Sequence, residues 1–254
     1  MNSLRPRVIP CLQIDQRSLV KTRSFKDPLY LGDPVNAVRI FNDLEADELI
    51  VVDISATRRG VGPDFEFIEE FASECFMPLA YGGGITEIGQ VRRLFDLGVE
   101  KVVLNSVTNL ADFVAASAAT FGRQSIVVSV DVRRSLLGRY EVCTHSGTRR
   151  TKRDPRHYAA DMQVAGAGEI FLQSIDREGS RSGYDLDLIR SVCGAVNVPV
   201  VACGGAGGLP DLRAAMLEGG AAAVSAGTMF ALHGKHRAPL ISYPRPAEVA
   251  ALLS

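Results

Sequence analysis

The sequence contains no tryptophan, and aromatic residues make up 7% of its 254 residues. Charge of one sign is also missing, because 28 lysines and arginines stand against 29 acidic residues. Such a chain has no overall field that draws in nucleic acid or an anionic membrane. No apolar run reaches the roughly 18 residues that a membrane span requires. We therefore expect no nucleic-acid partner and no membrane partner, and any anionic ligand must be bound at a local site.

Cysteines are few, scattered and without a CxxC pair: Cys11, Cys75, Cys143, Cys193 and Cys203. Their odd number and spacing indicate reduced thiols rather than a disulfide scaffold or a zinc site. His233 and His236 lack a third ligand nearby in the sequence, so we predict no metal and no other cofactor. The first residues, 1–7, lack the apolar core of a secretion signal, and we expect a cytoplasmic protein.

Short β-branched runs alternate along the chain with stretches of helical periodicity, such as Pro34–Phe41 and Leu209–Glu218. Eight strands are predicted: Val8–Leu12, Glu48–Asp53, Pro78–Tyr81, Lys101–Leu104, Ser125–Asp131, Glu169–Ile175, Pro199–Cys203 and Ala223–Ser225. Eight strand–helix units in about 250 residues match an α/β fold, the (βα)8 TIM barrel, which we expect as one domain over residues 1–254. A doubly wound open sheet is the structural alternative.

The sequence also repeats itself. A shift of 121 residues places Glu48 on Glu169 and Gly83–Gly84 on Gly204–Gly205, without a gap from strand through loop to helix. Upstream of that stretch, a shift of 118 places Gln13 on Asp131. The chain is therefore predicted to be two (βα)4 half-barrels, and equivalent loops should lie on opposite sides of one mouth.

Two matched glycine-rich loops follow the third and seventh predicted strands. Glycine runs let backbone N–H groups approach an anion closely, although one such loop alone is equally well explained as a tight turn. Two of them at carboxyl-terminal strand ends predict an elongated ligand with a phosphate at each end. The predicted phosphate-binding residues are Gly83, Gly84, Asn105 and Ser106 at the first site, and Gly204, Gly205, Ala226, Gly227 and Thr228 at the second.

Polar side chains at strand ends between these loops are candidates for the chemistry. Asp131 closes an otherwise apolar strand, where a carboxylate is costly unless it has a partner or a task, so we expect it to be catalytic. Asp53 either binds the ligand or orders the loop at Arg58–Arg59. The remaining predicted ligand-binding residues are Ser174, Asp176 and Gly179 after the sixth strand, and Lys21 in a polar loop, Val20–Phe25, that could close over the mouth.

At the opposite end of the predicted barrel, four charges of alternating sign stand at strand beginnings: Arg7, Glu48, Lys101 and Glu169. They could form a closed ring of salt bridges across the barrel bottom. Four separate, solvated strand caps are the alternative.

Taken together, these residues resemble the HisF family, the cyclase subunit of imidazole glycerol phosphate synthase. The resemblance extends to about Gly234 and includes Ile9–Leu12, Gly82–Ile85, Ser174–Arg177 and Gly204–Gly207. It implies a separate HisH-like glutaminase chain docked on the barrel bottom, with ammonia passing through the core to the mouth. The family's ammonia gate falls on the four bottom charges, which favours a ring over solvated caps.

The resemblance also implies that two aspartates, on the first and fifth strands, share the acid and base work. Asp131 is the second of them, but Gln13 occupies the first position, and glutamine carries no proton near neutral pH. Glu178 stands where the family has an aspartate. Segments such as Phe25–Pro28 and His233–Leu240 are more similar to HisF-like proteins of surface-polysaccharide clusters, which work with a glutaminase and a third, amidotransferase protein on acetamido sugars.

We therefore expect an ammonia-using synthase subunit of a glutamine amidotransferase that supports acetamidino-sugar formation in surface-polysaccharide (O-antigen) biosynthesis. One alternative is the cyclase of histidine biosynthesis, which converts phosphoribulosyl formimino-aminoimidazole carboxamide nucleotide (PRFAR) and ammonia to imidazole glycerol phosphate and aminoimidazole carboxamide ribotide. A second is a non-catalytic module that activates its glutaminase and channels ammonia. A phosphosugar isomerase without a partner is disfavoured by the bottom charges.

Overall fold

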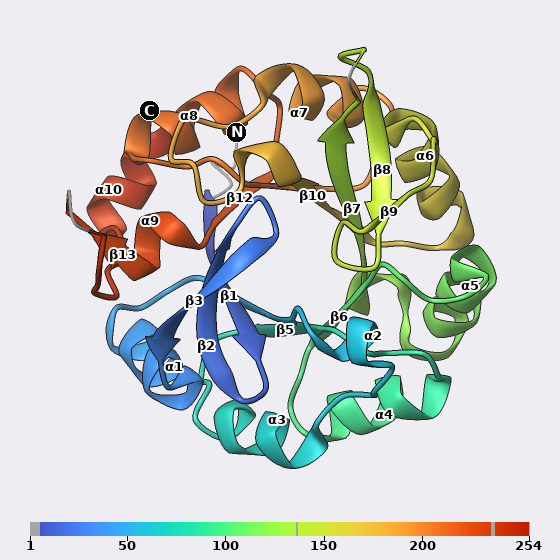
Figure 1. Ribbon diagram of the computed structural model, residues 1–254, viewed down its shortest axis with the longest axis horizontal. Helices are drawn as coiled ribbons and strands as arrows, with labels where there is room; N and C mark the ends of the chain where they lie inside the picture. The colour runs from blue at the N-terminus through green and yellow to red at the C-terminus, as the bar shows by residue number, and fades with distance from the viewer. Residues whose placement is uncertain (1–5, 136, 235–236, 254) are drawn as a thin grey trace.

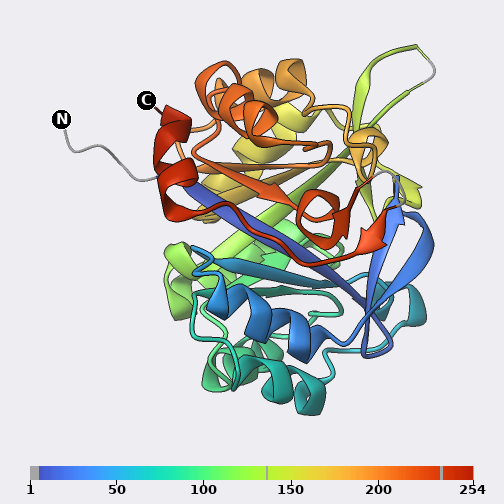
Figure 2. The same cartoon turned by 90° about the vertical axis from the view of Figure 1, so that its left-hand side faces the viewer.

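A computed structural model describes residues 6–135, 137–234 and 237–253. Eight parallel strands form a closed barrel with helices around it (Figure 1, Figure 2). In order around the barrel they are β1 (Arg7–Asp15), β4 (Leu49–Asp53), β5 (Leu79–Gly82), β6 (Lys101–Leu104), β7 (Ile126–Arg134), β10 (Glu169–Ser174), β11 (Val200–Cys203) and β12 (Ala223–Ala226). The predicted (βα)8 fold is confirmed, and the open sheet is wrong because β10 pairs with both β7 and β11, and β12 with β1.

The helices begin at residues suited to that position. At the start of the first helix, the Asp33 carboxylate accepts a hydrogen bond from Val35 N, and Pro34 occupies the first turn. Among the described residues, no helix combines the length and the apolar character needed to cross a membrane. The helices are α1 (Pro34–Asp43), α2 (Ala56–Arg59), α3 (Phe65–Ala72), α4 (Ile88–Asp96), α5 (Leu110–Phe121), α6 (Pro155–Ala165), α7 (Leu186–Cys193), α8 (Leu209–Leu217), α9 (Thr228–Ala231) and α10 (Pro246–Ala250), with 3-10 turns η1 (Arg123–Ser125), η2 (Ile175–Arg177) and η3 (Ala251–Leu253).

Two apolar layers stabilise the barrel. Successive strand residues point to opposite faces, so Val8 packs among the residues beneath the helices while Ile9 points into the barrel lumen. The lumen is filled by a separate cluster of buried side chains: Ile9, Cys11, Ile50, Ala80, Val103, Val127, Phe171, Val201, Cys203 and Ala223. An apolar column therefore lies between the two ends of the barrel.

Two of the barrel strands extend into hairpins, and Figure 2 shows both at the end opposite the start of β1. β1 continues into β2 (Ser18–Arg23) and β3 (Lys26–Gly32), and β7 into β8 (Tyr140–Thr144) and β9 (Arg149–Arg150). The prediction of a polar loop at Val20–Phe25 was wrong, because residues 20–23 belong to β2. Val20 pairs with Gln13 in a β ladder, which turns the Lys21 side chain into a buried position. A short hairpin near the C-terminus joins β13 (Leu232–His233) to β14 (Ala238–Pro239).

The internal repeat is present in backbone detail. Asp64 precedes α3 with φ −80° and ψ 87°, and its equivalent Asp185 precedes α7 with φ −83° and ψ 86°. Each carboxylate accepts a hydrogen bond of 3.2 Å from the amide three residues later. The two half-barrels thus use the same helix cap at equivalent places.

Candidate active site

A cavity of about 320 Å³ opens at the carboxyl ends of β1, β4, β5, β6, β7 and β10. It brings together the predicted site residues Gln13, Asp53, Gly83, Gly84, Asn105, Ser106 and Asp131. The lumen residues Cys11, Val103 and Phe171 form part of its wall, so the apolar column reaches the cavity directly. This position, at the mouth of the barrel, is where (βα)8 enzymes hold their active sites.

Asp131 is the buried carboxylate of this cavity, with 7% of its surface exposed. Ser129, two residues earlier on β7, donates a hydrogen bond of 2.6 Å from its hydroxyl to Asp131 Oδ1. Burial raises the pKa of Asp131 to about 6, although the Ser129 hydrogen bond acts in the opposite direction. A carboxyl group that titrates near neutral pH can both accept and donate a proton there.

Gln13 is held rigidly and does not act as a proton carrier. Its Oε1 accepts hydrogen bonds of 3.0 Å from both the backbone N and the hydroxyl of Thr22, and its Nε2 donates one of 3.2 Å to Glu178. Glu178 also pairs with Lys21, and both of these side chains are buried. Burial lowers the pKa of Lys21. We refer to Gln13, Lys21 and Glu178 as the mouth lock.

The residues of the first predicted phosphate site lie together on the cavity wall. Gly83 and Gly84 adopt φ values of 127° and 68°, which favour glycine, and a Cβ on Gly83 would lie 2.6 Å from the Asp53 carbonyl oxygen. Ser106 Oγ accepts a hydrogen bond of 2.8 Å from His145 N, and Asn105 Nδ2 donates one of 3.1 Å to Ser129 O. Backbone packing thus requires glycine at this turn, and the turn also lines the cavity.

The second predicted site lies apart from that cavity, whose wall, as far as the described residues show, includes none of Gly204, Gly205, Ala226, Gly227 or Thr228. Lys21 occupies the space beside it, because a Cβ on Gly227 would lie 2.9 Å from Lys21 Nζ. Thr228 Oγ1 is buried and has no hydrogen-bond partner within the described residues. A buried hydroxyl without a partner is costly, and an oxygen-rich ligand at this place would satisfy it.

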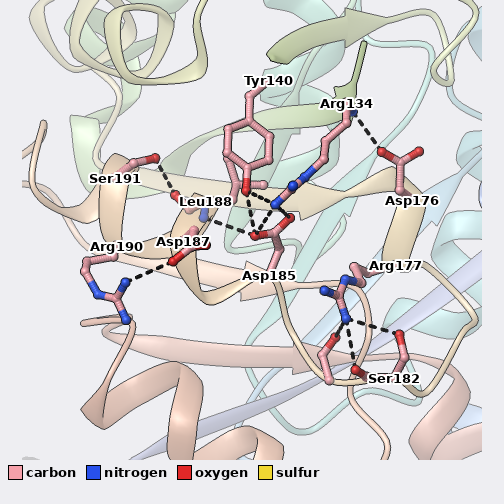
Figure 3. A network of polar contacts seen from close by, with 11 residues as sticks. Arg134, Tyr140, Asp176, Arg177, Ser182, Asp185, Asp187, Leu188, Arg190 and Ser191 are labelled. Atoms are coloured by element: carbon pink, nitrogen blue, oxygen red, sulfur yellow. Dashed lines mark hydrogen bonds and ion pairs between the residues drawn. The ribbon is translucent and has the colours of Figure 1, made fainter. Parts of the chain in front are cut away.

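The other predicted binding residues have structural partners. Asp53 Oδ1 accepts hydrogen bonds from Ser55 N, Ser55 Oγ and Ala56 N, so it orders the start of α2, which carries Arg58. Asp176 accepts a hydrogen bond of 2.8 Å from Arg134 N, outside the cavity wall (Figure 3). The backbone at Ser174 and Gly179 is closely packed against neighbouring chain segments. A Cβ on Gly204 would lie 2.6 Å from Ser174 O, and a Cβ on Gly179 would lie 2.6 Å from Thr22 O.

The four charges at the barrel bottom form the closed ring. Arg7 lies 3.0 Å from Glu48 and 2.6 Å from Glu169, and Lys101 lies 2.6 Å from Glu48 and 3.1 Å from Glu169. Both glutamates are almost fully buried, whereas the side chains of Arg7 and Lys101 are 33% and 20% exposed. Burial opposes the charge of Arg7, but the two glutamates hold its pKa above the ordinary value. Solvated strand caps are therefore wrong as a description of these residues.

The sequence contained no signal for one residue of the cavity, His145. It lies in the turn between β8 and β9, lines the cavity and is joined to Ser106 through its backbone. Only the hairpin brings it to this place, and no motif marks it. Across the described ranges, no group of three His, Cys, Asp or Glu side chains is arranged to hold a metal ion. His236 and residues 1–5 lie outside those ranges.

The fold and the site together define a (βα)8-barrel protein with a ring of partly buried ion pairs at its bottom and a buried carboxylate at its mouth. A protein-family model described as "Histidine biosynthesis protein" matches residues 7–237. The chain belongs to this family, among the HisF-like imidazole glycerol phosphate synthase subunits.

Three relatives illustrate this membership. The chain is 49% identical over 242 residues to "Putative imidazole glycerol phosphate synthase subunit hisF2" of Pseudomonas aeruginosa, which covers 95% of this chain and 96% of the relative. It is 46% identical to "Putative imidazole glycerol phosphate synthase subunit HisF" of Leptospira interrogans, over 98% of this chain and 99% of the relative. It is 45% identical to "Putative imidazole glycerol phosphate synthase subunit hisF3" of Vibrio vulnificus, over 96% and 95%.

Proposed function

We propose that this chain is the ammonia-using subunit of an imidazole glycerol phosphate synthase, and that it converts PRFAR and ammonia to imidazole glycerol phosphate and aminoimidazole carboxamide ribotide. The observation that carries the proposal is Asp131, a buried carboxyl with a pKa raised to about 6 in the mouth cavity. Such a group can transfer protons as the ammonia nitrogen replaces a carbonyl oxygen. The names of the relatives favour this reaction over the polysaccharide role that the sequence favoured.

Ammonia enters at the barrel bottom. The ring of Arg7, Glu48, Lys101 and Glu169 closes that end, and the apolar column between ring and cavity passes neutral NH3 in preference to NH4⁺, because a desolvated charge is costly there. A glutaminase chain of the HisH type docks at this end and supplies the ammonia. The ring charges act as its gate.

The phosphates of the substrate bind at the two glycine loops. The first lies open in the cavity, with Gly84 and Ser106 on its wall. At the second, the phosphate accepts a hydrogen bond from Thr228 Oγ1 and lies beside Lys21 Nζ, which stays paired with Glu178. The Lys21 ammonium group has three N–H donors, so it binds a phosphate oxygen and the Glu178 carboxylate together.

One observation favours a second candidate, the formation of an acetamidino sugar with a third, amidotransferase protein. The position of the first family aspartate is held by Gln13, whose amide is fixed by Thr22 and Glu178. A barrel with a single mouth carboxylate in that position could deliver ammonia to chemistry in another protein. A module without any catalysis is the limiting form of this candidate.

The test is ammonia-dependent consumption of PRFAR by the purified chain, with ammonium chloride at alkaline pH and both products quantified. We expect turnover without any glutaminase, because free ammonia replaces the partner. Absence of turnover, together with conversion of an acetamido nucleotide sugar when the glutaminase and amidotransferase are added, would establish the second candidate instead.

A further inference from the structure

The proposed reaction needs two groups that transfer protons. The first-strand position supplies neither of them, because Gln13 occupies it. As ammonia condenses with a carbonyl, the nitrogen loses protons and the carbonyl oxygen gains them and leaves as water. Asp131 provides one titratable group. The Gln13 carboxamide neither gains nor loses a proton near neutral pH, so the partner of Asp131 must come from elsewhere in the cavity.

The other carboxylates near the mouth are engaged. Glu178 is buried against Lys21 and Gln13 and does not line the cavity. Asp53 uses Oδ1 to order α2. Asp176 is held by Arg134 N and lies 3.6 Å from Arg133 Nε, also outside the cavity wall.

We propose that His145 is the second proton-transfer residue, in the place of a first-strand carboxylate; this inference rests on the proposed function. The β8–β9 turn carries His145 over the first phosphate site, where the backbone N–H of His145 donates a hydrogen bond of 2.8 Å to Ser106 Oγ. Thr144 Oγ1 lies 3.0 Å from His145 Nδ1 and fixes the ring. His145 lines the cavity, and within the described residues its Nε2 has no hydrogen-bond partner.

The β8–β9 turn is itself anchored at three points, which gives the imidazole a defined position. His145 and Ser146 both adopt φ values of 53°, and Ser146 Oγ donates a hydrogen bond of 3.0 Å to Ile54 O at the end of β4. At the tip of the turn, a Cβ on Gly147 would lie 3.0 Å from the ring of Phe25. The turn therefore bridges from β8 to β4 and to the β2–β3 hairpin.

Arg149 on β9 is the charged residue that acts on His145, and the charged residues Asp131 on β7, Asp53 on β4 and Arg58 on α2 line the same cavity. Burial, and then the positive charge of Arg149, lower the pKa of His145, so its ring is neutral at pH 7. At pH 7 and above both groups are in their basic forms, a neutral imidazole and an Asp131 carboxylate. Each takes one proton from the nitrogen and then gives it to the carbonyl oxygen, which leaves as water with both protons, so both groups return to their starting protonation.

The experiment compares the unaltered chain with His145→Gln, Asp131→Asn and His157→Gln, using PRFAR and ammonium chloride. His157 is an exposed residue of α6, so His157→Gln makes the same chemical change outside the cavity. We expect His145→Gln to lower kcat by about 10² to 10⁴ at nearly constant KM and to remove one ionisation from the pH profile of kcat. The His145→Gln/Asp131→Asn double variant should be little slower than either single variant, because the two groups act as a unit.

The outcomes separate the two proposals. No turnover by the unaltered chain overturns the proposed function and this inference with it. Turnover that His145→Gln leaves within about threefold of the unaltered rate, or reduces only through KM, overturns the inference alone, the latter marking His145 as a phosphate ligand. Thermal melting of each variant guards against loss of fold, and His145→Asn, which preserves Nδ1-like hydrogen bonding to Thr144, must show the same loss in kcat.

Discussion

The two half-barrels share a backbone frame but differ in the residues that act. Asp64 and Asp185 cap equivalent helices. A Cβ on Gly83 or on Gly204 would lie 2.6 Å from the carbonyl oxygen of Asp53 or of its equivalent Ser174. Their first strands then diverge. β1 carries Gln13, fixed within the mouth lock, whereas β7 carries Asp131, whose pKa is raised to about 6.

This difference teaches that the repeat preserves backbone packing and leaves the chemistry free to change. The glycine positions are set by neighbouring carbonyls, and any side chain there would displace the adjoining strand end. The first-strand position faces the mouth, where both Gln13 and Asp131 are held by hydrogen bonds. The proposed chemistry therefore draws on β7 and its hairpin in the second half, whereas each half contributes one phosphate site.

The mouth lock has no counterpart across the repeat, because Thr57 stands at the position equivalent to Glu178. Glu178→Gln should lower the free energy of unfolding by about 3 to 5 kcal/mol, since it leaves the buried Lys21 ammonium without its carboxylate. Urea unfolding measures the loss. The Lys21→Met/Glu178→Leu variant removes both charges and should recover most of it, and a double variant as unstable as Glu178→Gln would show that the ion pair is not the cause.

The shared glycine turns should respond alike. Gly83→Ala and Gly204→Ala should each lower the free energy of unfolding by about 2 to 4 kcal/mol, because both residues have positive φ and a carbonyl oxygen 2.6 Å from the new Cβ. Gly89→Ala, within α4 and with open space around it, is the matched control and should stabilise the chain by roughly 0.5 to 1 kcal/mol. A loss of unfolding free energy in only one of the two variants would show that the two glycine turns are not equivalent.

Asp131 gives the second half a pH-dependent cost that Gln13 does not give the first. Folding raises the pKa of Asp131 from 3.8 to about 6, so the folded state holds a proton that the unfolded chain has lost between those values. This stability contribution is full below pH 4 and is lost as the pH rises through 6. At pH 8 the free energy of unfolding of Asp131→Asn should therefore be about 2 to 3 kcal/mol higher than that of the unaltered chain. At pH 3.5 the two values should be equal. Equal stability at pH 8 would mean that Asp131 titrates normally.

The helix caps should show the smallest difference. Asp64→Ala should cost about 1 kcal/mol, because Asp64 caps α3 and its further partner, Arg17, is exposed. Asp185→Ala should cost about 2 kcal/mol, because the buried Asp185 carboxylate also accepts a hydrogen bond of 2.7 Å from Tyr140 and pairs with Arg134 (Figure 3). Chemical denaturation measures both losses of unfolding free energy. A larger loss for Asp64→Ala than for Asp185→Ala would contradict the larger contribution expected from the contacts of Asp185 with Tyr140 and Arg134.

The sequence predicted most of the fold because its signals are local. Strand runs such as Pro199–Cys203 and the spacing of the glycines depend on residues close together in the sequence. The repeat at 121 residues is visible when the sequence is compared with itself. Lys21 could not be placed in this way, since its burial depends on Glu178, which lies 157 residues away in sequence. His145 was missed for the same reason: Ser106, to which it bonds, lies 39 residues earlier.

The central claim is that the second half's carboxylate performs the ammonia-dependent reaction while the first half's glutamine only supports the mouth. The most direct measurement is kcat for PRFAR with ammonium chloride, in the unaltered chain, in Asp131→Asn and in Gln13→Asn. We predict a loss of about 10² to 10⁴ for Asp131→Asn and less than about tenfold for Gln13→Asn. Equal losses in both variants, or none in Asp131→Asn, would contradict the claim.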